Sequence, residues 1–259
     1  MEVPVKTFSG CDVPVVGLGT WKLRGEICET TVRKAVELGY RHIDTAAFYQ
    51  NESRVGDAIS HFDRERLFIT TKVWKDKLEY SDFKASAERS LDRLGLDRVD
   101  LLLIHWPNPD VPLEETISAM NDLVDEGKVS HIGVSNFEDD EQLDLARELS
   151  DYPIVNDQVE YHVGKDRSEL LDYCRNKGVG LTAYSPLAQG GVIDQKVTND
   201  LAAKYGKSPG QVALKWLVEQ ENVIAIPKAS SEDHLRENLN LFDWEMEEED
   251  LSVLEEVSL

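Results

Sequence analysis

The feature that most constrains the fold of this chain is an alternation of short apolar segments with longer amphipathic ones. We interpret eight apolar segments, each ending on polar residues, as strands: VVGLGTW, RHIDT, LFITTK, DLLLIHW, SHIGVSN, IVNDQVEY, GLTAYSP and VIAIPKAS. Charged segments of helical period separate them, for example SDFKASAERSLDRLG and SPGQVALKWLVEQ. Continuous apolar strands that alternate with helices indicate a parallel sheet covered by helices.

Eight such units in 259 residues predict a closed (β/α)8 TIM barrel, with residues 1–259 forming one domain. An open nucleotide-binding sheet would need a G-x-G-x-x-G fingerprint after its first strand, and GLGTWKLRG lacks that spacing. We expect residues 1–16 to form a hairpin that turns at Gly10 and closes the bottom of the barrel. Two extra helices are expected outside the repeat, in VTNDLAAKYG and EMEEEDLSVLEEVSL.

The charge balance narrows the range of partners. Fifty acidic residues against 28 basic ones give a formal net charge of −22, which argues against nucleic acid or an anionic membrane as the main partner. The acidity fits an ordinary cytosolic protein, or a halophile whose salt-rich cytosol screens the repulsion. We favour the second interpretation, although 15 lysines remain.

Cellular location is predicted from cysteines and hydropathy. The three cysteines, Cys11, Cys28 and Cys174, are odd in number and far apart, which favours a reduced cytoplasmic protein without disulfides. Apolar stretches such as VDLLLIHW are too short to span a bilayer, and MEVPVKTF does not resemble a secretory leader. We therefore expect a cytoplasmic protein.

Four polar residues close three consecutive strands or follow them. Asp44 ends the second strand, Tyr49 lies in the loop after it, Lys72 ends the third strand and His105 ends the fourth. Each has an ordinary structural explanation, such as a turn cap, a surface tyrosine, a solvated lysine or a core histidine. In a TIM barrel, however, the carboxyl ends of the strands meet at one mouth, where active sites lie.

Together the four residues suit proton donation to a carbonyl oxygen. A phenol has a pKa of roughly 10, and a nearby ammonium lowers it by stabilising the phenolate. We expect Lys72 to supply that charge to Tyr49, and Asp44 to hold Lys72 charged and oriented. His105 would then direct a donor at the substrate oxygen.

These segments make the sequence similar to the aldo-keto reductases over nearly the whole chain, from GLGTW to ENLNLFDWE. The similarity rests on GYRHIDTAAFYQNE, LFITTKVW, LLLIHWP, GKVSHIGVSNF, YSPLAQGG and IPKAS, in that order. The resemblance implies an NADPH-dependent reductase of small aldehydes or ketones, monomeric as is usual for that family, with Asp44, Tyr49, Lys72 and His105 as its catalytic tetrad. NADH is possible as a second cofactor.

The resemblance also implies a set of cofactor contacts. Ser135, Asn136 and Gln158 would bind the nicotinamide carboxamide, Tyr184 would stack on its ring, and Lys228 and Ser231 would meet the ribose 2′-phosphate. The pyrophosphate would be lined by Thr20, Trp21, Lys22, Ser185 and Leu187. Glu237 and Asn238 would lie near the adenine. Trp21 and Trp106 are expected to contact the substrate.

Three departures from the family pattern concern its C-terminal part. His234 stands where the family usually has an arginine over the adenine and 2′-phosphate, and Glu232 and Asp233 add negative charge there. Because the sequence stops at Leu259, we also expect it to lack much of the tail that shapes the substrate pocket in longer members. From His234, Glu232 and Asp233 we expect a weakened preference for NADPH.

Other classes of function remain open from the residues. The chain could be a cofactor-binding sensor or structural protein with little turnover, or a lyase that forms a Schiff base on Lys72. Metal-dependent hydrolysis is disfavoured because the six histidines show no ligand spacing such as H-x-x-x-H, and we expect no metal.

Overall fold

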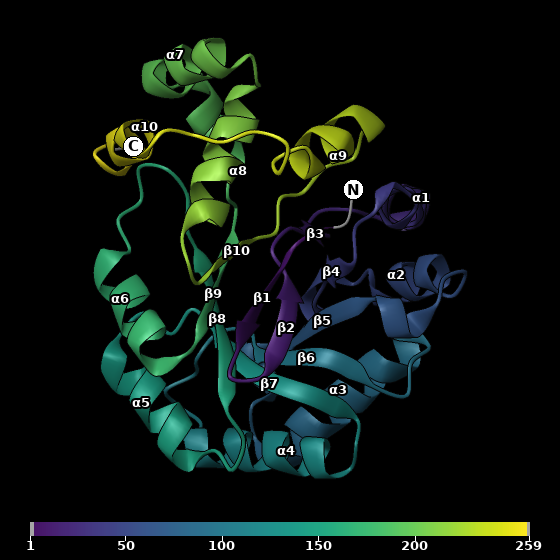
Figure 1. Cartoon of the computed structure of the whole chain (residues 1–259). Coiled ribbons are helices and arrows are strands. Elements are labelled where there is room, and N and C mark those ends of the chain that lie inside the picture. Colours follow the sequence, from purple (N-terminus) through teal and green to yellow (C-terminus); the bar gives the residue numbers. More distant parts are fainter. Residues whose placement is uncertain (1–2, 258–259) are drawn as a thin grey trace.

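The computed structural model describes residues 3–257, which form a barrel of parallel strands surrounded by helices (Figure 1). Neighbouring strands pair in parallel in the order β10-β9-β8-β7-β6-β5-β4-β3, and a parallel bridge from Val16 to Ala225 joins the two ends of the sheet. The predicted (β/α)8 barrel is thus confirmed. Its strands are β3 (Gly17–Gly19), β4 (His42–Asp44), β5 (Phe68–Val73), β6 (Val99–Ile104), β7 (Val129–Ser135), β8 (Ile154–Glu160), β9 (Gly180–Tyr184) and β10 (Val223–Ala225).

Helices follow the strands around the outside of the barrel. Those of the repeat are α1 (Gly25–Leu38), α2 (Glu52–Ile59), α3 (Tyr80–Leu94), α4 (Leu113–Asp125), α5 (Asp140–Leu149), α6 (Ser168–Lys177), α8 (Pro209–Glu219) and α9 (Glu232–Leu239). The two predicted extra helices are α7 (Lys196–Tyr205) and α10 (Glu248–Glu255). Short 3₁₀ turns are η1 (Ala47–Tyr49), η2 (Arg64–Arg66), η3 (Lys75–Lys77) and η4 (Ala188–Asp194).

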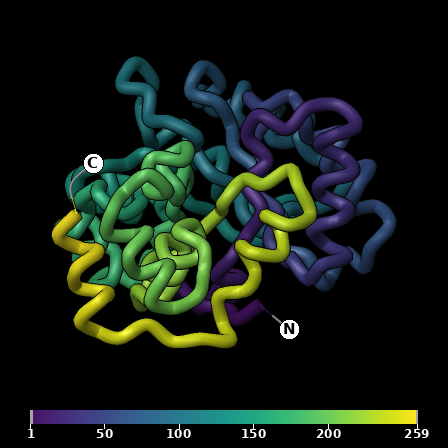
Figure 2. Tube along the Cα trace, turned by 90° about the horizontal axis from the view of Figure 1, so that it is seen from above, coloured from purple at the N-terminus to yellow at the C-terminus, as the bar shows by residue number. Residues whose placement is uncertain are grey.

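The extra helices pack against each other on the outside of the molecule. After α9 the chain runs along the surface (yellow in Figure 2) to α10, which lies next to α7. Lys204 of α7 pairs with Glu247 and Asp250 at 2.5 and 2.6 Å. Residues 1–2 and 258–259, which belonged to the predicted hairpin segment and last helical segment, lie outside the described residues.

The predicted hairpin is formed by the antiparallel strands β1 (Val5–Phe8) and β2 (Cys11–Pro14). Gly10 has φ +86°, a backbone conformation that favours glycine at a tight turn. Phe8, Cys11 and Val13 pack in one cluster with residues from the barrel strands, including Phe68 at the start of β5. The hairpin therefore covers the end of the barrel opposite the carboxyl ends of the strands.

Alternation along the buried strands decides which side chains reach the interior. All residues of β5 are buried. Thr70 contacts His42 of β4, whereas the next residue, Thr71, points the other way and donates to Glu52 of α2. Lys72 shares the side of Thr70 and so enters the barrel. This alternation places Lys72 inside the barrel and near its mouth.

Two general properties concern the described part of the chain. Cys11, Cys28 and Cys174 are all free and buried. Between residues 3 and 257 no helix combines the length and the apolar character needed to cross a membrane.

Candidate active site

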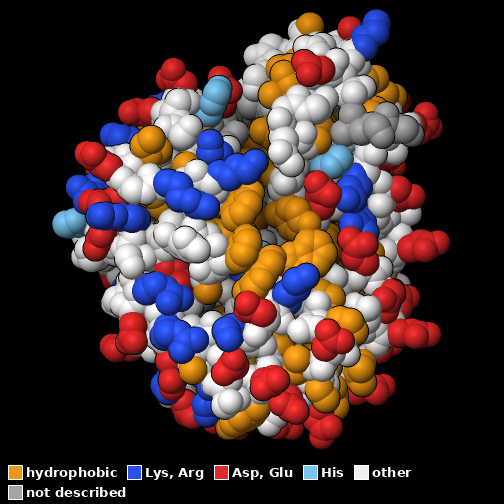
Figure 3. Space-filling view, turned by 180° about the vertical axis from the view of Figure 1, so that it is seen from behind, with side chains coloured by type: hydrophobic (Ala, Val, Ile, Leu, Met, Phe, Trp, Pro, Cys, Tyr) orange, Lys and Arg blue, Asp and Glu red, His pale blue; other side chains and the backbone are white. Residues whose placement is uncertain are grey.

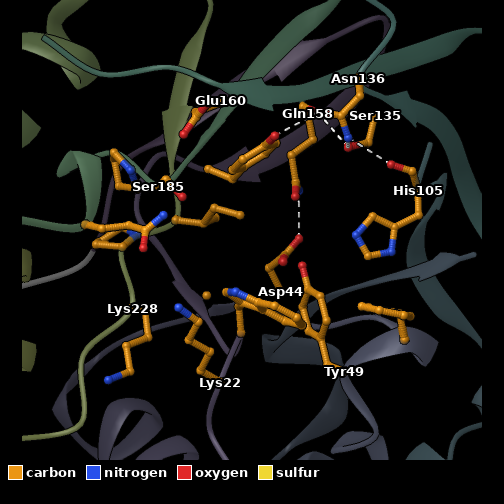
Figure 4. A pocket seen from close by; sticks show the side chains of 18 of the residues that line it. Lys22, Asp44, Tyr49, His105, Ser135, Asn136, Gln158, Glu160, Ser185 and Lys228 are labelled. Carbon is orange, nitrogen blue, oxygen red and sulfur yellow. Dashed lines mark hydrogen bonds between the residues drawn. The ribbon is translucent and has the colours of Figure 1, made fainter. Parts of the chain in front are cut away.

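The structure brings the four predicted catalytic residues together at the carboxyl ends of β4, β5 and β6. Figure 4 shows three of them, Asp44, Tyr49 and His105, around the cavity. Asp44 is the last residue of β4, Lys72 lies one residue before the end of β5, and His105 directly follows β6. Tyr49 ends the 3₁₀ turn η1 rather than lying in an irregular loop. Lys72 Nζ donates to Asp44 Oδ1 at 2.6 Å and to Tyr49 Oη at 3.4 Å.

The charged pair beneath Tyr49 is fully enclosed by protein. The side chains of Lys72 and Asp44 are 0% and 1% exposed. Lys72 Nζ donates a third hydrogen bond to the carbonyl oxygen of Thr45 at 3.0 Å, and Gln158 Nε2 donates to Asp44 Oδ2 at 2.8 Å. A buried ion pair is tolerated when further hydrogen bonds satisfy it, as they do here.

Burial determines the protonation of the groups that face the cavity. Burial, aided by the charge of Asp44, raises the pKa of Tyr49 well above its usual value. Burial and, to a smaller extent, the charge of Lys72 lower the pKa of His105 to about 2. At neutral pH Tyr49 therefore keeps its proton and His105 is neutral. From the sequence we expected a lowered pKa for Tyr49; in this structure burial has the largest effect and the pKa is raised.

Burial also lowers the pKa of Lys72, an effect that the adjacent Asp44 carboxylate opposes. The ammonium thus depends on Asp44 for its charge, as expected from the sequence.

A second group of side chains lies at the ends of β7, β8 and β9. Asn136 has φ +63°, and its Nδ2 donates to the carbonyl oxygen of His105 at 2.9 Å. Tyr184 Oη donates to Asn136 Oδ1 at 3.0 Å, and Ser135 Oγ donates to the carbonyl oxygen of Gln158 at 2.7 Å. This strained turn therefore ties the His105 loop to Tyr184. Figure 4 shows Asn136 beside Ser135 and His105.

These groups line one cavity of about 630 Å³ at the mouth of the barrel. Hydrophobic side chains gather at the centre of the face seen in Figure 3, opposite the hairpin in front in Figure 1. The predicted site residues that line the cavity are Trp21, Lys22, Asp44, Tyr49, His105, Trp106, Ser135, Asn136, Gln158, Tyr184, Ser185, Leu187 and Lys228.

Several predicted contacts do not line this cavity. Thr20 is fully buried, and its Oγ1 donates to the carbonyl oxygen of Asp44 at 2.9 Å. Lys72 lies beneath the cavity floor. The remaining four residues are at or on α9: Ser231, His234, Glu237 and Asn238.

The start of α9 nevertheless follows the cavity lining closely along the chain. Lys228 lines the cavity, and Ser231, three residues later, caps the helix. Ser231 Oγ accepts from the backbone N–H of His234 at 3.3 Å. Glu232 pairs with Arg236 at 2.6 Å and lies 3.8 Å from Lys34, so its charge is largely compensated. The repulsion that we expected from Glu232 is thereby reduced.

Sequence reasoning missed some residues of the cavity. Phe48 directly precedes Tyr49, Trp74 follows β5, and Glu160 ends β8, where it pairs with Lys165 at 2.5 Å. Their position next to strand ends was the available signal. The other missed lining residues are Gly19, Pro186, Gln189, Gly190, Ile226 and Pro227.

The lining fits a long ligand with an amide at one end and phosphates at the other, as a nicotinamide dinucleotide has. The polar uncharged side chains of Gln158, Ser135 and Asn136 lie at the end of the cavity near His105, while Lys22 and Lys228 lie together on the opposite side (Figure 4). Within residues 3–257, no group of three or more His, Cys, Asp or Glu side chains is arranged to hold a metal ion.

Comparison with known proteins identifies the class of this chain. The model of the aldo/keto reductase family matches residues 15–259. Glyoxal reductase of Bacillus subtilis is 42% identical over 254 residues, which cover 97% of this chain and 91% of that protein. The chain belongs to the aldo/keto reductase family.

Solved structures agree with this assignment. A thermostable aldo-keto reductase in complex with the inhibitor epalrestat has a TM-score of 0.92 at 41% identity, with 97% of this chain and 98% of that one covered. The Bombyx mori aldo-keto reductase in complex with NADP has a TM-score of 0.90 at 32% identity, with 98% and 92% covered. The protein is thus an NAD(P)H-dependent oxidoreductase that acts on carbonyl or hydroxyl carbons.

Proposed function

We propose that this protein reduces small aldehydes and ketones to alcohols with NADPH, and that Tyr49 is the general acid. The observation that best supports this proposal is the contact of Lys72 Nζ with both Asp44 and Tyr49 at the floor of the cavity. A reduction adds a hydride to the carbonyl carbon and a proton to its oxygen. The bound nicotinamide supplies the hydride, and the chain must supply the proton.

Tyr49 has the properties of that proton donor. Its raised pKa keeps the hydroxyl protonated at neutral pH, so that the proton is available when the carbonyl oxygen becomes negative. Lys72 Nζ then stabilises the phenolate that Tyr49 leaves behind. Asp44 holds Lys72 in place.

His105 would orient the carbonyl oxygen as a neutral donor. Its Nδ1 is buried and has no hydrogen-bond partner among residues 3–257, so Nε2 is the ring nitrogen available to a ligand. We assign the proton of the neutral ring to Nε2 on this ground. A donor at that place would stabilise the charge that develops on the substrate oxygen.

The phosphate groups of the cofactor would meet the exposed Lys22 and Lys228 at the cavity and the start of α9. Neither lysine has a carboxylate within ion-pair distance among the described residues. Ser231, His234, Glu237 and Asn238 would form the adenine end. We expect the protein to act as a cytoplasmic monomer.

A Schiff base on Lys72 is disfavoured as an alternative. The ammonium is completely buried and already donates to three oxygens, so no carbonyl substrate can reach it as a free amine.

The proposal is tested with Tyr49→Phe and a panel of aldehydes, each assayed with NADPH and with NADH. The variant lacks only the proton donor, so we expect reductase kcat to fall by about 10²–10⁴-fold. Cofactor affinity, measured by quenching of tryptophan emission, should stay within about twofold of the wild type. A folded variant with near-normal turnover would exclude Tyr49 as the general acid.

A further inference from the structure

The side chain of Asn51 does not cap the helix that it begins. Asn51 is the N-cap residue of α2, where an asparagine oxygen usually accepts from a backbone N–H of the first turn, but here no such bond forms. The residue is 2% exposed, and its amide reaches away from the helix to two other segments. A buried amide that forgoes the cap bond indicates that these other contacts matter.

The Nδ2 group of Asn51 binds both ends of one four-residue turn. It donates to the carbonyl oxygen of Thr20 at 2.9 Å and to that of Leu23 at 3.2 Å. The turn also closes on a bond of its own, from the N–H of Leu23 to the carbonyl oxygen of Thr20 at 3.0 Å. The exposed side chain of Arg24 donates to the carbonyl oxygen of Leu23 as well, from Nη1 at 3.1 Å. Asn51 therefore holds the turn from its buried side.

This turn carries Trp21 and Lys22, whose side chains line the cavity. Lys22 has φ +67°, a left-handed conformation that is unfavourable for a residue with a Cβ atom and persists where surrounding contacts enforce it. The carbonyl groups that Asn51 holds belong to the residues on either side of Trp21 and Lys22. Without these bonds we expect the backbone at Lys22 to relax, which would move both side chains.

The oxygen of the same amide binds the segment between Asp44 and Tyr49. Thr45 Oγ1 donates to Asn51 Oδ1 at 2.8 Å. The carbonyl oxygen of Thr45 in turn accepts from Lys72 Nζ at 3.0 Å. One buried side chain thus connects the turn at Lys22 to the residue that supports the ammonium of Lys72.

From these contacts we propose that Asn51 is a positioning residue, which fixes the Thr20–Leu23 turn relative to Lys72 and Tyr49. It acts through the turn and through Thr45, and touches no reacting atom. The inference rests on the proposed reductase function, in which Lys22 would meet a cofactor phosphate and Tyr49 would donate the proton. A fixed turn would keep the cofactor at the distance from Tyr49 that hydride and proton transfer require.

The first test is hydrogen exchange of the cofactor-free protein, followed by mass spectrometry. In Asn51→Ala a peptide covering residues 19–24 should exchange about tenfold faster, because the turn loses two hydrogen bonds. Asn51→Asp, which keeps the oxygen for Thr45 but loses the Nδ2 donor, should show the same change and serves where Asn51→Ala does not fold.

Asn222→Ala is the matched control for this exchange experiment. It removes another buried asparagine, whose Nδ2 donates to the carbonyl oxygen of Leu171 at 3.4 Å. Asn222 directly precedes β10 and so lies at the end of the barrel opposite the cavity. Exchange at residues 19–24 should be the same in this variant as in the wild type.

The second test measures NADPH binding and turnover. We expect Asn51→Ala to raise the Kd for NADPH about tenfold and to lower kcat about tenfold. Thr45→Val removes only the hydroxyl that Asn51 accepts from, so it should lower kcat about threefold and change the Kd less than Asn51→Ala does. In the double variant kcat should be no lower than in Asn51→Ala, since both changes break the same link.

The outcomes separate this inference from the proposed function. Unchanged exchange at residues 19–24 in the Asn51 variants would overturn the positioning role, as would a normal Kd and kcat in a folded Asn51→Ala that is merely less stable. A kcat in the double variant equal to the product of the two separate losses would exclude the link through Thr45. If the wild type reduces no carbonyl compound with either nicotinamide cofactor, the proposed function itself has failed, whereas the exchange experiment still decides whether Asn51 holds the turn.

Discussion

At the scale of single residues, burial has a larger effect on the ionisable groups inside the barrel than their charged neighbours do. Tyr49 stays protonated although Lys72 lies beside it, and His105 stays neutral. His42, in β4 and completely buried, behaves in the same way: burial lowers its pKa to about 4, against the opposing charge of Asp44. Desolvation disfavours the charged form of each group, and for a histidine this makes folding sensitive to acid.

We therefore predict that His42 is a cause of acid sensitivity. The unfolded chain binds this proton near pH 6.5, whereas the folded chain binds it only near pH 4, so protonation favours unfolding between these values. Its contribution to the free energy of unfolding is fully present above pH 6.5 and is lost as the pH falls towards 4. Between pH 7 and pH 4.5 the loss should be about 2 kcal/mol.

The measurement is urea unfolding of the wild type and of His42→Gln, which keeps a polar group for Thr70 Oγ1, 3.0 Å away. The wild type should lose about 2 kcal/mol more than the variant between pH 7 and pH 4.5. Carboxylates titrate in both proteins and cancel in the comparison. Equal losses would show that His42 is not the responsible group.

At the scale of elements, the start of α2 links the Tyr49 segment to two other parts of the barrel. Glu52, three residues after Tyr49, is 1% exposed. Its Oε1 accepts from Thr71 Oγ1 of β5 at 2.5 Å, and its Oε2 accepts from Arg93 Nε of α3 at 2.7 Å. The helix start is thus tied to the strand that carries Lys72.

We predict that removing Arg93 and removing Glu52, which form an ion pair, lower the free energy of unfolding by different amounts. Arg93→Met leaves a buried carboxylate without compensation, whereas Glu52→Gln removes the buried charge and keeps an acceptor for Thr71. Because the Arg93 side chain is 37% exposed, solvent screens part of the loss, and we expect Arg93→Met to cost about 1–3 kcal/mol of unfolding free energy. Glu52→Gln should cost less in the same chemical denaturation experiment, and the reverse order would contradict this account.

The start of α9 leads to a prediction about the choice of cofactor. His234 is exposed in the first turn of this helix, and it cannot offer the permanent charge or the bidentate geometry of an arginine. His234→Arg should therefore raise the preference for NADPH over NADH by about tenfold, since a charge-assisted contact contributes about 1.5–3 kcal/mol.

Two measurements check this prediction: the ratio of kcat/KM for the two cofactors, and their dissociation constants from tryptophan quenching. Lys207→Arg, whose lysine pairs with Asp243, is a suitable control because it adds a guanidinium away from the cavity lining. If His234→Arg leaves both ratios unchanged, the 2′-phosphate lies elsewhere.

At the scale of the whole molecule, the barrel carries a formal net charge of −22. Many lysines and arginines are already paired with carboxylates on the surface, for example Lys128 with Glu88 and Glu126. Each such exposed pair contributes only about 0–1 kcal/mol, whereas the surplus negative charges repel one another across the entire surface. Salt weakens both effects, and the repulsion should dominate.

We therefore predict that added KCl stabilises the protein. The Tm should rise continuously between about 0.01 M and about 1 M KCl, because the screening length drops from about 30 to about 3 Å over this range. Sucrose at matched osmolality controls for effects that do not depend on charge. A Tm that is flat or falls with KCl would argue against adaptation to a salt-rich cytosol.

The sequence by itself determined the order and type of the elements, because hydrophobic periodicity is a local property of the chain. The eight strands, the hairpin at Gly10 and the extra helices α7 and α10 all follow from it. Strand ends could also be located, and in a parallel barrel they converge on one mouth. For this reason Asp44, Lys72 and His105 could be predicted to lie close together.

Only the tertiary structure determined the burial and the side-chain contacts of these residues. No local pattern shows that Tyr49 is buried deeply enough for its pKa to rise beside an ammonium. Nor does the sequence show that Phe48 stacks on both Trp21 and Trp74, which come from two other loops. Desolvation and ring contacts depend on which distant segments pack together, and packing is specified by the whole barrel rather than by neighbours in the chain.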